Sequence, residues 1–378
     1  MAGRAAVGAS WPPSDDVRRA VAPRWADGTV TWLELTLDQV FTGTPAPDFA
    51  RALDAASAAG RLVGHGVMAS PYTCPRDAVA RAWMAKAKQV LRRWPVQWLT
   101  DHIGCARAAG WHAAPLPLPP SRALVRHVQD HLAWLSGELE VPVGLENLAL
   151  ACSQDDVLHQ PELLEAMLAP VDGVLLLDLH NLWCGAVNYG LDPVALLERY
   201  PLERVVELHI AGGRWGDDFR RDTHDGPVPA EVWALLPEAL ARCPQLKVVV
   251  WERLPGTLSD AASADAELLQ LADALGGAAR GGGYGVKRAE MPGGADAEGH
   301  RIGALRLQAA DQRADFGAAP LGHHVQHIVQ RSFGRLRGNG ADILKRQRAT
   351  VAVFIQCQLL DHAGEVAGAD IIGDIRQR

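Results

Sequence analysis

Short runs of apolar and β-branched residues recur along the first two thirds of this 378-residue chain, each bounded by turn residues. Most of the intervals hold a stretch whose apolar residues repeat at helical spacing, such as PDFARALDAASAAG at 47–60. The pattern predicts eight strands, at residues 5–10, 30–35, 61–67, 96–104, 141–149, 173–182, 204–213 and 246–254.

The alternation of strands and helices indicates the fold class. Nearly continuous apolar strands separated by amphipathic helices are typical of a parallel sheet covered by helices on its faces. Eight such units fit a closed (β/α)₈ barrel of the TIM type better than an open sheet. We therefore expect an α/β protein with a TIM-type barrel, and a doubly wound open sheet is the alternative.

The composition changes near residue 276. All twelve tryptophans lie before this point, and a glycine-rich stretch, GGAARGGGYGVKRAEMPGGADAEGH, begins there. The net charge is −11 up to residue 276 and +4 beyond it. We expect a barrel domain over residues 1–276, followed over 277–378 by a Gly/Arg-rich linker and a poorly ordered C-terminal extension of uncertain structure. A frame-shifted reading of unrelated sequence is an alternative for this extension.

Composition argues against several functional classes. The formal net charge of −7, with no stripe of basic residues, argues against a nucleic-acid partner. The sequence lacks an apolar run long enough to span a membrane and an apolar segment typical of a signal peptide, so we expect a cytoplasmic protein. The six cysteines form no CxxC pair, which argues against a zinc ribbon or a disulfide framework.

Residues that can bind metal ions stand at or just after the carboxyl ends of most predicted strands. They are Glu34, His65, Asp101, His102, Glu146, Asn147, Asp178, His180, Asn181, His209, Asp222, His224 and Glu252. In a TIM-type barrel these ends form one rim, where so many carboxylates would repel each other unless cations lay between them. Mixed imidazole and carboxylate ligands without cysteine favour iron, manganese or catalytic zinc over magnesium or calcium. About nine ligands suit two or three ions that share carboxylates.

Four segments resemble motifs of the multinuclear non-heme iron-dependent oxidative enzymes, in matching order and spacing. These segments are GLENLAL at 144–150, LLLDLHNLWCGAVNYGLDP at 175–193, ELHIAGG at 207–213 and DTHDGPVPAEVWALL at 222–236. Looser matches extend the resemblance over residues 5–260. The family has a TIM-type barrel with two or three irons on its rim.

The resemblance implies a function and a site. Such enzymes use dioxygen at a mixed-valent iron pair to oxidise cysteine residues of ribosomally synthesised precursor peptides, commonly with a partner protein that binds the leader peptide. By resemblance, metal binding is expected at His65, His102, Glu146, Asp178, Asn181, His209, Asp222, His224 and Glu252. Supporting or substrate contacts are expected at His180, Asn147 and Asn188. No residue is singled out as the catalytic group, and a leader-binding role is a second hypothesis for the extension.

The chain departs from the family pattern at three positions. His180 stands where the family usually has asparagine, Tyr189 where it usually has histidine, and Gly213 where a second histidine often follows alanine-glycine. Because His180 follows Asp178 by two residues, we expect both on one side of an extended strand. His180 is then a further ligand or a partner of one, and the alternative is that it only forms hydrogen bonds within the barrel. Two other functions stay open: a metal-dependent hydrolase or isomerase of the apurinic-endonuclease or xylose-isomerase kind, and a barrel that has lost its metals and acts as a binding partner.

Overall fold

The structure is a computed structural model that describes residues 5–277, apart from positions 43–44, 74–77, 109–110, 119, 152, 217–218 and 259. The predicted linker and extension over 277–378 lie outside the described residues, except for Gly277. No helix of the described part is long and apolar enough to cross a membrane.

Eight parallel strands form a closed barrel in the order β1-β12-β9-β8-β7-β4-β3-β2. They are β1 (Ala6–Ser10), β2 (Trp32–Thr36), β3 (Leu62–Gly66), β4 (Leu99–His102), β7 (Val143–Glu146), β8 (Val174–Asp178), β9 (Val205–Ile210) and β12 (Val248–Trp251). Strand β1 pairs with β12 on one side and with β2 on the other, which closes the sheet. The predicted TIM-type barrel and its eight strands are confirmed, and the open-sheet alternative is wrong.

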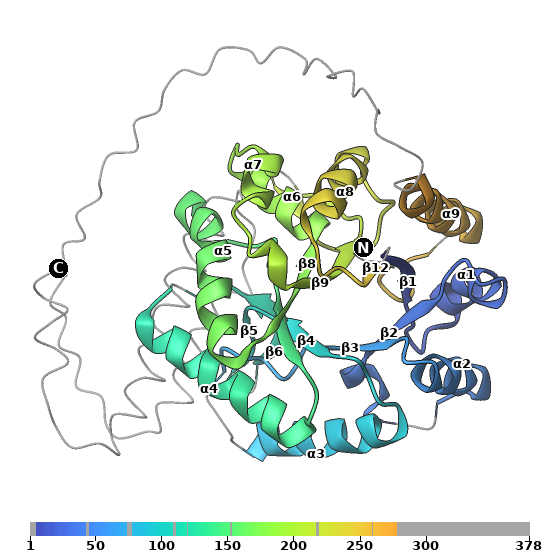
Figure 1. Cartoon of the computed structure of the whole chain (residues 1–378), viewed down its shortest axis with the longest axis horizontal. Helices are drawn as coiled ribbons and strands as arrows, with labels where there is room; N and C mark the ends of the chain where they lie inside the picture. Colours follow the sequence, from blue (N-terminus) through green and yellow to red (C-terminus); the bar gives the residue numbers. More distant parts are fainter. Residues whose placement is uncertain are drawn as a thin grey trace, which may run out of the picture.

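The helices surround the barrel (Figure 1). They are α1 (Asp15–Ala26), α2 (Pro47–Ala58), α3 (Ala78–Arg93), α4 (Arg122–Leu139), α5 (Gln154–Leu168), α6 (Leu179–Asn188), α7 (Pro193–Leu197), α8 (Ala230–Arg242) and α9 (Ala261–Gly277). The last helix, α9, packs against α1 and so completes the helical layer. Short 3₁₀ helices cover Leu37–Val40, Ala169–Val171 and Leu202–Arg204.

Two small hairpins are inserted between barrel units. One pairs β5 (Cys105–Ala108) with β6 (Trp111–Leu116), and the other pairs β10 (Arg214–Trp215) with β11 (Arg220–Arg221). The first follows β4 and the second follows β9, so both begin at the carboxyl ends of barrel strands. The second hairpin leads directly into the predicted ligands Asp222 and His224.

The alternation of side chains along the strands separates two environments. The main apolar core joins strand residues such as Leu33 and Leu35 to the surrounding helices. A smaller apolar cluster of Val63, Trp98, Val248 and partners stands apart from it, near the amino ends of the strands. The polar side chains of the same strands are therefore concentrated toward the carboxyl ends, where a TIM-type barrel carries its active site.

Candidate metal centre

The predicted ligands all lie at the carboxyl-terminal rim of the barrel. His65 belongs to β3, His102 ends β4, Glu146 ends β7, Asp178 ends β8, Asn181 lies in α6, His209 lies in β9, Asp222 and His224 follow β11, and Glu252 follows β12. Seven separate stretches of chain therefore contribute side chains to one region.

Three groups of ligand atoms overlap on this rim. Each group has its ligand atoms within 4.8 Å of one another: His65, His102 and Glu146; Glu146, Asp178 and His209; and Asp178, His224 and Glu252. Glu146 belongs to the first two groups and Asp178 to the last two. A carboxylate shared between neighbouring groups has the position of a bridging ligand in a multinuclear site.

The first group is built around one oxygen of Glu146. The Nε2 atoms of His65 and His102 lie 3.3 Å and 3.1 Å from Glu146 Oε2. The Nδ1 atom of His65 is hydrogen-bonded to Thr100 Oγ1 at 3.0 Å, which leaves Nε2 to face the carboxylate. The two imidazoles and the carboxylate oxygen thus converge from three different strands.

The second group depends on the junction between β8 and α6. Asp178 caps α6, because its Oδ1 accepts a hydrogen bond from the backbone N–H of Asn181 at 2.7 Å. The side-chain amide of Asn181 donates to Glu146 Oε1 at 3.2 Å and to the carbonyl of Asn147 at 3.0 Å. Capping therefore fixes one oxygen of Asp178 and leaves the other free to face the rim.

The third group is more open to solvent. His224 Nδ1 lies 3.3 Å from Glu252 Oε1, and His224 Nε2 lies 2.7 Å from Asp222 Oδ1. His224 has a φ of 50°, in the left-handed region that costs a non-glycine residue about 1 to 3 kcal/mol. The strained backbone of His224 thus belongs to a residue whose two ring nitrogens both face carboxylates.

The residues fit a metal centre, because their free atoms are buried and unsatisfied. Among the described residues, hydrogen-bond partners are lacking for Glu146 Oε2, Asp178 Oδ2, Asn181 Oδ1, His102 Nδ1, His209 Nδ1 and His224 Nε2. Buried polar atoms without partners are rare in proteins, since each costs about 1 to 3 kcal/mol. Several of these atoms lie within 3.3 Å of another ligand atom without hydrogen-bond geometry, as expected where both point at a common cation.

Electrostatics divides the site into two halves. Around Glu146, burial raises the pKa of that carboxyl well above its usual value and lowers the pKa of His65. Burial also lowers the pKa of His102 to about 4, and burial with the nearby Asp222 charge raises the pKa of Asp178 to about 6. The two imidazoles are therefore neutral at neutral pH, the form that binds metal ions.

The other half of the site is charged. Burial disfavours the charged form of both histidines here too. Glu34 and Glu252 nevertheless raise the pKa of His209 well above its usual value. Asp222 and Glu252 likewise raise the pKa of His224 well above its usual value. In turn, His224 lowers the pKa of Asp222, and His224 and His209 lower the pKa of Glu252, although burial acts in the opposite direction. Without metal, protons on these imidazoles compensate the carboxylates, so metal binding here is expected to release protons.

The expected position of His180 on an extended strand is wrong. Strand β8 ends at Asp178, and His180 is the second residue of helix α6, because Asp178 starts the helix as its cap. His180 is fully buried, and its Nδ1 lies 2.8 Å from Asp222 Oδ1. The imidazole therefore contacts a predicted ligand from the helix that follows the strand.

Asn147 and Asn188 bind backbone segments next to predicted ligands. Asn147 accepts from the N–H of Asp178 at 2.7 Å and donates to its carbonyl at 3.0 Å. Asn188 makes the same two-way contact with the backbone of Arg220 in β11, two residues before Asp222. Both residues therefore contact the backbone at or near a predicted ligand and not the candidate metal position itself. Their supporting role remains a prediction.

Two buried glutamates outside the nine predicted ligands, Glu34 and Glu207, form a fourth group of ligand atoms with His209. Glu34 is among the strand-end residues noted from the sequence, whereas Glu207 is not. Glu34 Oε2 lies 2.8 Å from His209 Nε2, and Glu207 Oε1 lies 3.6 Å from the same nitrogen. Glu207 also accepts a hydrogen bond from Trp98 Nε1 at 2.7 Å. The spacing ELH, which places Glu207 and His209 on one side of a strand, is a sequence signal for the second glutamate.

Exposure identifies the mouth of the site. The side chains of His102, Asp222, His224 and Glu252 are 16 to 23% exposed, whereas that of Asp178 is fully buried. A substrate entering from the rim therefore meets the third group and His102 first.

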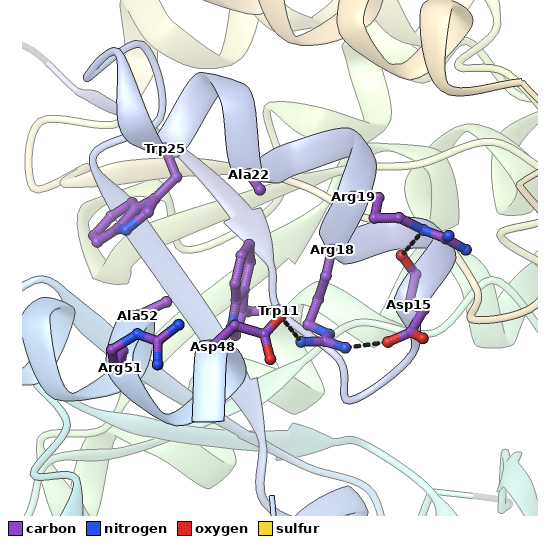
Figure 2. Close-up of a pocket in the computed structure, with 9 residues that line it drawn as sticks. All are labelled: Trp11, Asp15, Arg18, Arg19, Ala22, Trp25, Asp48, Arg51 and Ala52. Carbon is purple, nitrogen blue, oxygen red and sulfur yellow. Dashed lines mark hydrogen bonds and ion pairs between the residues drawn. The ribbon is translucent and has the colours of Figure 1, made fainter. Parts of the chain in front are cut away.

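A separate hollow of about 470 Å³ lies outside the barrel, between α1 and α2 (Figure 2). Trp11 and Trp25 line it together with Arg19 and Arg51. Arg18 crosses between the two helices and pairs with Asp48 at 2.6 Å and with Asp15 (Figure 2). The Arg18–Asp48 pair connects the amino-terminal ends of two neighbouring helices, and the Arg18–Asp15 pair lies within α1.

Fold and site together define a TIM-type barrel with candidate metal-ligand clusters at its carboxyl-terminal rim. The chain belongs to the family described as RiPP precursor modification enzyme MbnB/TglH/ChrH, whose sequence model matches residues 16–271. RiPP denotes a ribosomally synthesised and post-translationally modified peptide.

Individual relatives agree with this assignment. A UPF0276 protein of Caulobacter vibrioides is 32% identical over 180 residues, which is 47% of this chain and 64% of the relative. A UPF0276 protein of Acaryochloris marina is 30% identical over 213 residues, 54% of this chain and 76% of the relative. The chain thus matches somewhat less than two thirds of the Caulobacter protein's length.

Two solved structures match more than two thirds of this chain, with low sequence identity and TM-scores below 0.5. Endonuclease IV from Thermus thermophilus is 16% identical with a TM-score of 0.46, over 72% of this chain and 98% of that one. An L-ribulose 3-epimerase is 14% identical with a TM-score of 0.47, over 76% of this chain and 100% of that one.

Proposed function

We propose that this protein oxidises a cysteine residue of a ribosomally synthesised precursor peptide, with dioxygen as the oxidant, at a centre of two or three iron ions on the barrel rim. The observation that carries the proposal is the overlap of three ligand groups through Glu146 and Asp178. Membership in a family of RiPP precursor modification enzymes supports the precursor peptide as substrate. A separate protein that binds the leader peptide is the expected partner.

The residues that would hold the ions are the nine predicted ligands. Iron bound there would supply the redox capacity that the side chains lack, since none of these side chains is itself a redox cofactor. The neutral imidazoles of His65 and His102 are ready to bind without first losing a proton. Asn181 and Thr100 orient Glu146 and His65 by hydrogen bonds, which reduces the reorganisation needed on binding.

The position of the partly exposed ligands indicates where the peptide would approach. His102, Asp222, His224 and Glu252 face the mouth, so the cysteine of the peptide would enter beside the third group. The deeper ligands around Asp178 are excluded from water, which strengthens electrostatic interactions there.

The test combines metal analysis with turnover. Protein purified without oxygen is loaded with iron-57, counted for iron and examined by Mössbauer spectroscopy, then mixed with a cysteine-containing precursor peptide encoded beside its gene. We expect two to three irons per chain, oxygen uptake and a mass change in the peptide, with both oxygen uptake and mass change lost when the peptide cysteine is replaced by serine.

Variants separate the metal centre from the substrate. Asp178→Ala should reduce iron content and turnover together, whereas Asp192→Ala, which removes only the cap of the short surface helix α7, should change neither. Activity with zinc or manganese toward a hydrolytic substrate, without oxygen uptake, would contradict the oxidative function and favour the hydrolase or isomerase.

A further inference from the structure

His209 is held between carboxylates that reach it from opposite sides. On one side, its Nε2 atom lies 2.8 Å from Glu34 Oε2 with hydrogen-bond geometry. On the other, its Nδ1 atom lies 3.0 Å from Glu252 Oε2 without such geometry and is one of the buried atoms that lack a partner among the described residues. The two nitrogens of the ring are therefore in different situations.

We infer that Glu34 is a positioning residue that keeps the proton of neutral His209 on Nε2, so that Nδ1 is the nitrogen that binds the metal. The inference rests on the proposed metal centre and goes beyond it, because Glu34 is not one of the nine ligands. A metal-binding imidazole usually donates its other N–H to a carboxylate or carbonyl, which fixes the tautomer and the orientation of the ring.

Burial makes the contact between Glu34 and His209 specific. Both side chains are at most 1% exposed, so water cannot replace either partner. Glu34 is contributed by β2 and His209 by β9, which are not neighbours in the sheet, so the contact crosses the inside of the barrel. Glu34 therefore holds the ring at Nε2 from across the barrel, while Glu252 faces Nδ1.

Glu207 supports the same arrangement from behind. One of its oxygens accepts the Trp98 indole N–H at 2.7 Å, and the other lies 3.6 Å from His209 Nε2, beyond hydrogen-bond distance. Trp98 thus binds one oxygen of Glu207, and the other lacks a hydrogen-bond partner among the described residues. Glu34 is the nearer acceptor for the His209 proton, at 2.8 Å against 3.6 Å. A further metal ion between Glu34, Glu207 and His209 would instead require Nε2 to be the ligand.

The first test observes the ring directly in the unmodified protein. Full-length protein with nitrogen-15 histidine is titrated with Zn²⁺, and His209 is assigned by comparison with His209→Asn. We expect the His209 signals to show a proton on Nε2 and zinc on Nδ1. A proton on Nδ1 with zinc on Nε2 would overturn the inference while leaving the metal centre intact.

The second test measures metal affinity. Metal-free Glu34→Gln is titrated with Co²⁺ against a chromophoric chelator, and the visible d–d spectrum is recorded. Because glutamine is a weaker acceptor and can donate to Nε2 instead, we expect affinity at the His209 position to fall about 10- to 100-fold with a changed spectrum. Glu34→Asp, which retains a carboxylate, should recover part of the loss.

A control and three outcomes make the result decisive. Asp38→Asn removes a partly buried carboxyl group just after β2, one bound to Trp83 and the backbone of Val67, and should bind Co²⁺ like the parent protein. Unchanged Co²⁺ affinity in Glu34→Gln would overturn the inference but not the proposed function. Loss of one full Co²⁺ equivalent in both Glu34→Gln and Glu207→Gln would also overturn only the inference, because it would indicate a metal ion between those two glutamates. Failure of the parent protein to bind Zn²⁺ or Co²⁺ overturns the proposed function as well.

Discussion

A β-carbon placed on Gly213 would lie 2.9 Å from Cε1 of His180 and 2.3 Å from the carbonyl oxygen of Arg221. The absence of a side chain at 213 is therefore what allows the His180 ring and the β10–β11 hairpin to lie where they do. Two departures from the family pattern, a histidine at 180 and a glycine at 213, are in this way parts of one local arrangement.

Gly213→Ala is therefore expected to damage the site. The new methyl group must displace the backbone of Arg221, and with it the adjacent Asp222, so we expect a loss of about 1 to 3 kcal/mol in stability and weaker metal binding. Thermal unfolding and iron content measure the two effects. Gly137→Ala, on the exposed face of α4 with open space around it, should instead stabilise the protein by about 0.5 to 1 kcal/mol. Normal iron content in Gly213→Ala would contradict the coupling.

Glu146→Gln should have opposite effects on stability and on metal binding. Burial raises the pKa of Glu146, which means that its charge is disfavoured in the folded protein without metal. We expect the metal-free variant to melt at a higher temperature than the parent protein, and to bind less iron because the carboxylate shared by two ligand groups is gone. Differential scanning calorimetry and iron analysis test this, with the exposed Glu162→Gln as control. A lower melting temperature with full iron content would contradict both expectations.

The rim could be predicted from sequence because strand ends are local features. Runs such as LLLD and VVVWE show both the buried strand and the polar residue that ends it, and barrel closure brings those ends together. The position of His180 could not be predicted in the same way, since Asp178 is compatible with both a continuing strand and a helix cap. The contact between Glu34 and His209 joins positions 175 residues apart across the barrel interior, and it depends on strand order and register.

The metal-free protein should lose stability as the pH rises above about 6.5, the usual pKa of histidine in an unfolded chain. The folded-state pKa values of His209 and His224 are raised, and that of Glu34 is raised to about 7, so the folded protein retains protons that the unfolded chain has already released. Their stabilising contributions are complete below the unfolded pKa values and are lost as the pH passes the folded ones. Melting temperatures measured across this range with a chelator present test the sign.

Metal-loaded protein is the matched comparison for this pH series. Bound cations replace the protons on His209 and His224, so its melting temperature should depend less on pH over the same range. A metal-free protein that becomes more stable as the pH rises would show that the imidazoles are not protonated in the fold.

Arg18→Ala should destabilise the packing of α1 on α2 without affecting the metal site. The Arg18 side chain is 6% exposed and pairs with Asp15 and Asp48, which are themselves largely exposed (Figure 2). Since both aspartates can be solvated after the change, we expect a cost of about 1 to 2 kcal/mol, mostly from lost packing. Arg19→Ala, whose parent side chain is exposed, should change stability by less than about 0.5 kcal/mol. Urea unfolding measures both, and an equal cost would argue against the bridging role.

A chain ending after Gly277 should fold and bind metal like the full-length protein. Helix α9 supplies the buried side chains Leu268 and Leu271 to the core, and its Glu267 accepts hydrogen bonds from Trp251 and Arg253 beside the rim. The helical layer is therefore complete once α9 is present. We expect unchanged iron content, melting temperature and peptide turnover in this shortened chain.

A second truncation shows whether the experiment can detect a loss. A chain ending at residue 260 lacks α9, exposes the apolar surface of α1 and β1 that α9 covers, and should be strongly destabilised. If the chain ending after Gly277 loses turnover while it keeps its iron and its melting temperature, the segment beyond residue 277 takes part in handling the peptide, as the hypothesis of a fused leader-binding module requires. If the chain ending after Gly277 loses iron or stability, residues beyond 277 are needed for the barrel to fold or bind metal.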